Sequence, residues 1–219
     1  MYSANRILVV FSDTGDEHKA TYDHIEKVSR WCQDQQFEFW HITPDMGFHR
    51  RSWLSLIFQY RRNNTVGSKA FPKTCTDNLK LVPIYNFIEA WLHANYPAVT
   101  KDSRKAGFYQ FAELYGEIGM MIGIAAGEEK RVSKNKETAK WRKATVQKLY
   151  PLLEWGLDRA ACQKEVYRYA DRLASYGLSE PPIPSNCRRC PFMDKRELLL
   201  LYRTDRPAYD EWVELEQAK

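Results

Sequence analysis

The chain has 219 residues, 44% of them hydrophobic and 28% charged, and its 33 basic and 28 acidic side chains give a net charge of +5. This composition is typical of a globular protein, and the length fits one domain or one domain with a small appendage. No run of 18 apolar residues occurs, so the sequence predicts no transmembrane helix. The mild positive charge suits phosphorylated ligands or nucleic acid without distinguishing between them.

The five cysteines give an indication of the redox environment in which the protein is found. The beginning of the chain lacks a basic stretch followed by an apolar one, so we expect no secretory signal. An odd number of cysteines in such a chain favours a reduced, cytoplasmic protein with metal-binding or structural thiols over a disulfide scaffold.

The first part of the chain predicts a βαβ unit. Residues 6–11 are apolar almost throughout, as in a strand of a parallel sheet that is buried on both faces. The polar residues 12–18 are suited to cap a following helix, with Asp16 and Glu17 in its first turn. Residues 37–43 then form a second strand. The inward face of the helix is expected to hold Tyr22, Ile25, Val28 and Cys32, with Cys32 as a small buried hydrophobe.

The middle of the chain predicts helices and two more strands. Residues 52–62 and 103–117 have helical composition, and residues 63–74 are a polar, basic loop. A further helix is expected next, with Pro83 in its first turn. Its amphipathic face would hold Phe87, Ile88, Trp91 and Leu92. The strands are expected at residues 119–125 and 146–153.

The last third predicts a polar loop, several helices and an extended segment. Residues 126–145 are charged and are expected to form a surface loop. Asp158 is a good N-cap for a helix that Gly177 would end. Residues 179–186 carry three prolines and form an extended loop, and residues 194–202 and 207–217 are helical. The inward stripe of the helix after Asp158 would be Cys162, Val166, Tyr169, Leu173 and Tyr176.

The cysteine spacing predicts a metal centre. Cys187 and Cys190 form a C-x-x-C pair, which supplies at most half of a four-thiolate site for a [4Fe–4S] cluster or Zn²⁺. Cys162 lies in the first turn of a helix expected to face inward, and Cys75 lies beside a helix start. We therefore expect Cys75, Cys162, Cys187 and Cys190 as ligands, with reduced structural thiols as the alternative.

Four motifs in a characteristic order resemble the phosphoadenosine phosphosulfate (PAPS) reductase family, over about residues 7–193. The first is residues 10–18, with Asp13, Thr14 and Gly15. The second is residues 73–83, with Lys73, Cys75, Lys80 and Pro83. The third is residues 123–131, with Gly123, Ile124, Glu128 and Arg131. The fourth is residues 150–192, with Tyr150, Pro151, Trp155, Cys162, Pro184, Cys187 and Cys190.

The resemblance implies the adenine nucleotide α-hydrolase-like fold, a mostly parallel, doubly wound α/β sheet with helices on both faces. It also implies that ATP or a sulfonucleotide binds at the carboxyl ends of the strands. The cysteine pattern is most similar to the iron–sulfur branch of the family, which includes DNA-phosphorothioation and phage-type members. On this basis residues 1–193 are the α/β domain and residues 194–219 a helical extension. The expected nucleotide and phosphate contacts are Asp13, Thr14, Gly15, Lys73, Lys80, Glu128 and Arg131.

The sequence departs from the family pattern at three places. The Ser-Gly-Gly-x-Asp-Ser phosphate loop has no counterpart before Arg6, so we expect either an internal start within a longer protein or a degenerate form. The tail lacks the nucleophilic cysteine of true PAPS reductases, and Ala125 replaces a phosphate-binding arginine.

Two functional hypotheses follow from these patterns. The first is an enzyme of nucleotide activation or sulfur transfer, with an adenine nucleotide, nucleic acid or a second subunit as partners and no membrane. The second is a non-catalytic binding or scaffold module that keeps the fold without the phosphate loop. The sequence does not identify a catalytic residue.

Overall fold

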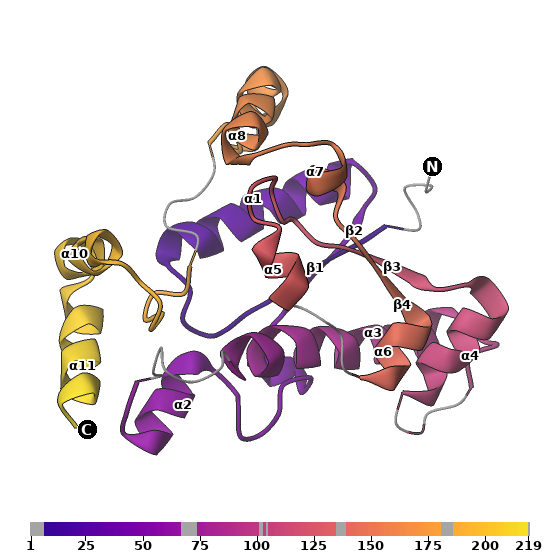
Figure 1. The fold of residues 1–219 in the computed structure, drawn as a ribbon, viewed down its shortest axis with the longest axis horizontal. Coiled ribbons are helices and arrows are strands. Elements are labelled where there is room, and N and C mark those ends of the chain that lie inside the picture. Colours follow the sequence, from indigo (N-terminus) through magenta and orange to yellow (C-terminus); the bar gives the residue numbers. More distant parts are fainter. Residues whose placement is uncertain are drawn as a thin grey trace. The chain divides into compact units, whose positions relative to one another are not determined.

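The computed structural model describes residues 7–66, 74–100, 103, 105–134, 139–180 and 186–218. The chain divides into two compact units, the first made of Met1–Phe87 with Tyr176–Lys219 and the second of Ile88–Ser175. The C-terminal helices, expected to be a separate extension, therefore belong to the same unit as the N-terminal strands. Both units combine helices with a small parallel sheet (Figure 1), so the chain is an α/β protein.

The first unit opens with the predicted βαβ arrangement. Strand β1 (Leu8–Ser12) and strand β2 (Glu38–Ile42) pair in parallel, and helix α1 (Lys19–Asp34) connects them. The register places Leu8 opposite Glu38. Helix α1 buries Ile25 and Cys32, and Cys32 is 1% exposed, as its position on the apolar face predicted.

The described elements that directly follow β2, up to residue 95, are helical, and the boundary between the two units falls within the last of them. The short 3₁₀ turn η2 (Pro44–Met46) precedes α2 (Leu56–Asn63), which begins where the Ser55 hydroxyl accepts a hydrogen bond from the Phe58 N–H. The π-helical turn η3 (Thr76–Leu81) runs directly into α3 (Val82–Asn95). Pro83 lies in the first turn of α3, as predicted, although the π-helical turn already precedes this helix.

The C-terminal helices α10 (Lys195–Thr204) and α11 (Arg206–Gln217) agree with the sequence prediction. Asp194 caps α10 in a reciprocal arrangement with Glu197, which fixes the start of the helix. Both helices pack into the core of the first unit. The buried residues of that core are Leu56, Tyr60, Val66, Leu79, Met193, Leu201, Ala208, Trp212 and Leu215.

The second unit contains the other parallel pair, β3 (Ile118–Met121) with β4 (Val146–Leu149), preceded by helix α4 (Ala106–Tyr115). Both strands were predicted, although β3 is shorter than expected. The predicted loop at residues 126–145 is wrong in part, because it contains α5 (Lys130–Lys134) and α6 (Lys140–Thr145). Two side chains anchor α6: Thr145 is fully buried, and the Trp141 ring lies 4.8 Å from that of Phe108.

The segment after β4 forms α7 (Pro151–Glu154), α8 (Arg159–Arg168) and α9 (Ala170–Ala174). Asp158 caps α8 as predicted, by accepting a hydrogen bond from the Ala161 N–H at 2.7 Å. The expected inward stripe is wrong, because the helix breaks at Tyr169, whose side chain is 44% exposed. Helices α8 and α9 contain no buried residue. Gly177 follows them with φ +68°, a conformation that suits a helix end.

The described strands form two separate two-stranded sheets and not one continuous sheet. None of the helices in the described part of the chain is long and apolar enough to cross a membrane.

Candidate functional site at the end of strand β1

The polar segment that follows β1 is buried. From Ser12 to His18 only Gly15 is partly accessible, and Thr14 and Asp16 are 2% and 1% exposed. The expectation that these residues cap helix α1 is wrong, because His18 is the N-cap and makes no side-chain capping bond. The segment instead makes contacts with distant parts of the first unit.

Asp13 is surrounded by groups that stabilise its charged form. One of its carboxylate oxygens accepts hydrogen bonds from the Gly15 N–H at 2.7 Å and the Tyr22 hydroxyl at 2.9 Å. The other lies 3.6 Å from Nε2 of His41. Burial raises the pKa of Asp13, but the contacts with His41, Gly15 and Tyr22 outweigh burial and lower it overall. Burial and the contact with Asp13 raise the pKa of Tyr22, so its phenol stays protonated.

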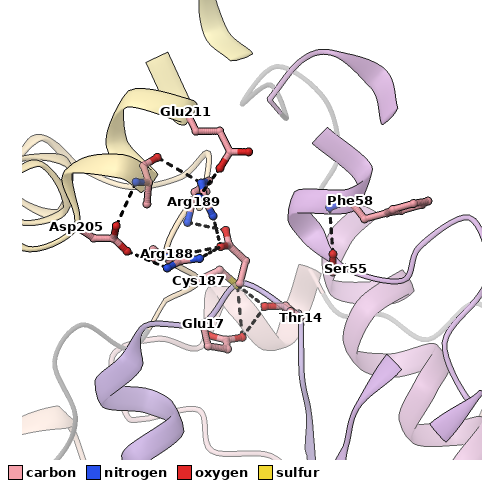
Figure 2. A network of polar contacts seen from close by, with 12 residues as sticks. Thr14, Glu17, Ser55, Phe58, Cys187, Arg188, Arg189, Asp205 and Glu211 are labelled. Carbon is pink, nitrogen blue, oxygen red and sulfur yellow. Dashed lines mark hydrogen bonds and ion pairs between the residues drawn. The ribbon is translucent and has the colours of Figure 1, made fainter. Parts of the chain in front are cut away.

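Cys187 lies against this segment and is held as a neutral thiol (Figure 2). Its sulfur is 3.4 Å from the Thr14 hydroxyl and 3.6 Å from Oε1 of Glu17, and the Thr14 hydroxyl also donates to Glu17 at 2.8 Å. Burial and the Glu17 charge raise the pKa of Cys187 to about 12, against a smaller opposite effect of Lys80. In the absence of a metal ion, a thiol of this kind is a weak nucleophile.

Two arginines of the Cys187–Cys190 hairpin pair with Asp16. Arg188 and Arg189 both contact its carboxylate, and the Arg188 N–H donates to the Asp16 carbonyl oxygen at 2.7 Å. Burial raises the pKa of Asp16, although the charges of Arg189 and Arg188 oppose this rise. The fully buried carboxylate thus joins residues 173 positions apart.

Carboxylates of the C-terminal helices complete this network (Figure 2). Arg188 pairs with Asp205 at 2.8 Å, and Arg189 pairs with Glu211. Glu211 also accepts from Arg61 of α2 at 2.7 Å. The Arg189 charge is balanced by these carboxylates within the protein. Because its side chain is only 6% exposed, Arg189 is not available to a ligand.

Gly15 allows helix α2 to approach the segment. Its φ is +69°, and a Cβ atom at this position would lie 2.4 Å from Cβ of Ser55. The Leu56 N–H donates to the Thr14 carbonyl oxygen at 2.7 Å across the same contact. A side chain larger than hydrogen therefore has no room here.

The predicted metal ligands are divided between the two units. Cys75, Cys187 and Cys190 pack against the same apolar core of the first unit, whereas Cys162 lies in α8 of the second. Among the residues that the structure describes, no group of three or more His, Cys, Asp or Glu side chains is placed to hold a metal ion. Three of the four predicted ligands thus share one apolar core, and the four-thiolate site stays a prediction.

The predicted phosphate contacts lie in different environments. Lys73 falls outside the described residues, and Lys80 is half-buried in the last turn of η3. In the second unit, Glu128 accepts hydrogen bonds from Arg159 and Arg131, which lower its pKa. Arg131 is 56% exposed, so it could also contact a ligand.

Sequence reasoning missed the partners that bury the segment. No local pattern marks His18, His41 or His49 as part of the site, although one ring nitrogen of His49 lies 3.0 Å from the Asp13 carbonyl oxygen. The pairing of Asp16 with Arg189 has no local signal in the sequence, because the two residues are 173 positions apart.

No protein-family model matches this chain, and no curated protein or solved structure matches it. The residues and their geometry are therefore the basis for a functional proposal.

Proposed function

We propose that the chain is a PAPS-reductase-like, adenine-nucleotide-binding protein that acts in nucleotide activation or sulfur transfer. The observation that carries the proposal is the parallel β1–α1–β2 unit with the Asp13–Thr14–Gly15 loop directly after β1. Open α/β sheets bind ligands outside the carboxyl ends of their strands, and this loop is at such an end. The proposal includes the doubly wound sheet of that family, for which parallel strand pairs are the building elements.

In this proposal the buried loop residues act by shaping the backbone. Asp13 and Thr14 are 7% and 2% exposed, so their side chains fix the loop and do not contact a ligand. The contacts with phosphate or sulfate oxygens are assigned to Lys80 in the first unit and Arg131 in the second, because cations are the usual partners of such oxygens. These two residues belong to different units, and each is tested separately.

No chemical step of this proposal depends on a metal ion. The cluster or Zn²⁺ predicted on Cys75, Cys162, Cys187 and Cys190 is tested by iron and zinc analysis of protein purified without oxygen, together with absorbance near 400 nm. Bound iron that is lost in Cys187→Ser would support the predicted centre. Metal content unchanged by that substitution would exclude Cys187 as a ligand.

A second candidate function is a non-catalytic binding or scaffold module. The observation in its favour is that the polar side chains of the loop after β1 already have protein partners. Asp16, Glu17 and Thr14 are all hydrogen-bonded to other protein groups. Polar groups used in this way stabilise a fold and are not free for catalysis. The possible partners of such a module include a nucleic acid or a second protein subunit.

Calorimetric titration with Mg-ATP, combined with an assay of pyrophosphate release, distinguishes the two candidates. The nucleotide-binding proposal predicts saturable binding that weakens about tenfold or more in Lys80→Gln or Arg131→Gln, since a hydrogen bond to a charged group is worth about 1.5–3 kcal/mol. Arg206→Gln and Arg168→Gln are the matched controls on exposed surfaces of the two units. A folded protein without ATP binding would refute the proposal and favour the module.

A further inference from the structure

An open groove in the first unit is not used by the proposed site. It lies along helix α1 and strand β2 and has a volume of about 580 Å³. Pockets for small molecules usually have volumes of about 300–1,000 Å³. The residues that line the groove are Ile25, Glu26, Ser29, Arg30, Phe39 and His41.

Arg30 brings an unpaired positive charge to this groove. Its exposed side chain has no hydrogen-bond or ion-pair partner among the residues whose contacts the structure describes. Several other arginines of the described chain are paired, such as Arg188 and Arg189 with Asp16, and Arg131 with Glu128. A guanidinium without a partner at the wall of a groove is suited to bind phosphate or carboxylate oxygens.

His41 is held in a fixed orientation beside the groove. Its ring packs edge-on against Phe11 with centroids 5.4 Å apart and is tilted against Tyr22 at 6.4 Å. Nε2 lies 3.6 Å from the Asp13 carboxylate, beyond normal hydrogen-bond length. Asp13 is itself fixed by Gly15 and Tyr22, so the imidazole is placed before any ligand arrives.

The other lining residues restrict the chemistry of the ligand. Ile25 and Phe39 provide an apolar surface on which a flat ring could stack, and Ser29 adds a hydroxyl donor on the same helix as Arg30. Glu26 is one turn before Arg30 and supplies an acceptor for an amino group. A matching ligand has an anionic group for Arg30, a flat apolar ring for Phe39 and an amino group for Glu26. A nucleoside monophosphate combines these three features.

We propose that this groove binds a nucleoside monophosphate, with its phosphate at Arg30 and His41 and its base against Phe39. The site is separate from the loop after β1 and does not require ATP to bind there. None of the residues that line the groove is part of the proposed ATP site. The two sites are linked only by the proximity of His41 to Asp13.

The probe is AMP, titrated into the full chain by calorimetry, with adenosine and inorganic phosphate titrated separately. We expect Arg30→Gln to weaken AMP binding at least tenfold, and adenosine and phosphate each to bind at least tenfold more weakly than AMP. Phe39→Leu should weaken AMP and adenosine and leave phosphate unchanged. Arg62→Gln, an exposed arginine of α2 outside the groove, should leave AMP binding unchanged, and circular dichroism checks that each variant is folded.

The outcomes separate this inference from the proposed function. AMP binding that is insensitive to Arg30→Gln but is lost in Lys80→Gln would overturn the groove site and support the site after β1. Absence of AMP binding to the folded chain would also overturn it. AMP binding that depends on Arg30 in a chain that does not bind ATP would support the groove and refute the ATP proposal alone.

Discussion

The loops that follow β1 and β3 occupy equivalent places in two parallel strand pairs but use their charges in opposite ways. After β1, Asp16 is 1% exposed and its carboxylate pairs with two arginines inside the protein. After β3, Glu128 also pairs with two arginines, but Arg131 and Arg159 are 56% and 75% exposed. The same combination of one carboxylate and two guanidinium groups is structural in the first loop and solvated in the second.

The difference shows that charge pattern alone does not identify a binding site. An exposed ion pair contributes at most about 1 kcal/mol and leaves its arginines free to exchange partners. Removal of one partner from a buried pair leaves an uncompensated charge and costs about 3–5 kcal/mol. Accessible cations are therefore the better candidates for ligand contacts, and buried ones are the better candidates for stability.

The largest expected effect is the loss of Arg189. Arg189→Leu should lower the free energy of unfolding by about 3 kcal/mol or more, because Asp16 stays buried with only Arg188 to balance it. Urea denaturation at pH 7 measures this change. Arg159→Leu is the matched variant in the second loop and should cost less than about 1 kcal/mol. Similar costs for the two variants would remove the distinction between the loops.

Glycines in the two loops provide a second comparison. Gly15 and Gly127 both have positive φ, +69° and +87°, but a Cβ on Gly127 would meet nothing within 4 Å. Gly127→Ala should cost about 1–2 kcal/mol from the backbone conformation alone. Gly15→Ala should add about 1–3 kcal/mol for the clash with Ser55. Thermal unfolding of both variants tests this order. An equal loss of stability would show that Ser55 moves away from the new methyl group with no energetic penalty.

Acidification should weaken the first unit through its buried histidines. Burial lowers the pKa of His18 and His49 below 6.5, assisted by Arg188 for His18 and opposed by the Asp13 carbonyl oxygen for His49. The unfolded chain then binds more protons than the folded chain, so stability present above pH 6.5 is lost as the pH falls toward the folded values. The loss is at most about 1.4 kcal/mol per pH unit for each histidine.

Urea midpoints between pH 8 and pH 5 measure this dependence. The double variant His18→Gln, His49→Gln should flatten the curve in that range, whatever its effect on the absolute stability. A curve with an unchanged slope would mean that other groups cause the loss.

The smallest expected effect concerns Glu128. Glu128→Gln removes the ion pairs with Arg159 and Arg131 and should lower stability by at most about 1 kcal/mol. The difference from the unsubstituted chain should shrink between 50 mM and 500 mM NaCl, because salt screens exposed charges. An effect that persists at high salt would indicate that this carboxylate is less solvated than its surroundings suggest.

Local patterns in the sequence predicted those parts of the fold that depend on near neighbours. The β1–α1–β2 unit, the burial of Cys32, the Asp158 cap and the two C-terminal helices all follow from apolar periodicity or capping residues. The stripe beginning at Cys162 failed because helical spacing shows which residues share a face and not whether another element covers it.

The candidate site was predicted less completely. The sequence located Asp13, Thr14 and Gly15 at the end of a strand, but it did not show that the side chains of Asp13 and Thr14 are buried. The contacts that cover the segment come from Ser55, Cys187 and the arginines of the hairpin, which are 40 to 176 positions away. The exposure of Arg131 could not be inferred for the same reason, since it depends on which elements pack around it.

The division of the chain has a consequence for biosynthesis. The second unit is one continuous insertion, Ile88–Ser175, within the first. It can begin to fold while the ribosome is still translating the C-terminal helices, because domains generally fold as units during synthesis. The first unit must wait for Asp205 and Glu211 before the charges of Arg188 and Arg189 are balanced. A nascent chain stalled after Ser175 would thus contain the complete insertion, while the N-terminal part of the first unit still lacks its C-terminal partners.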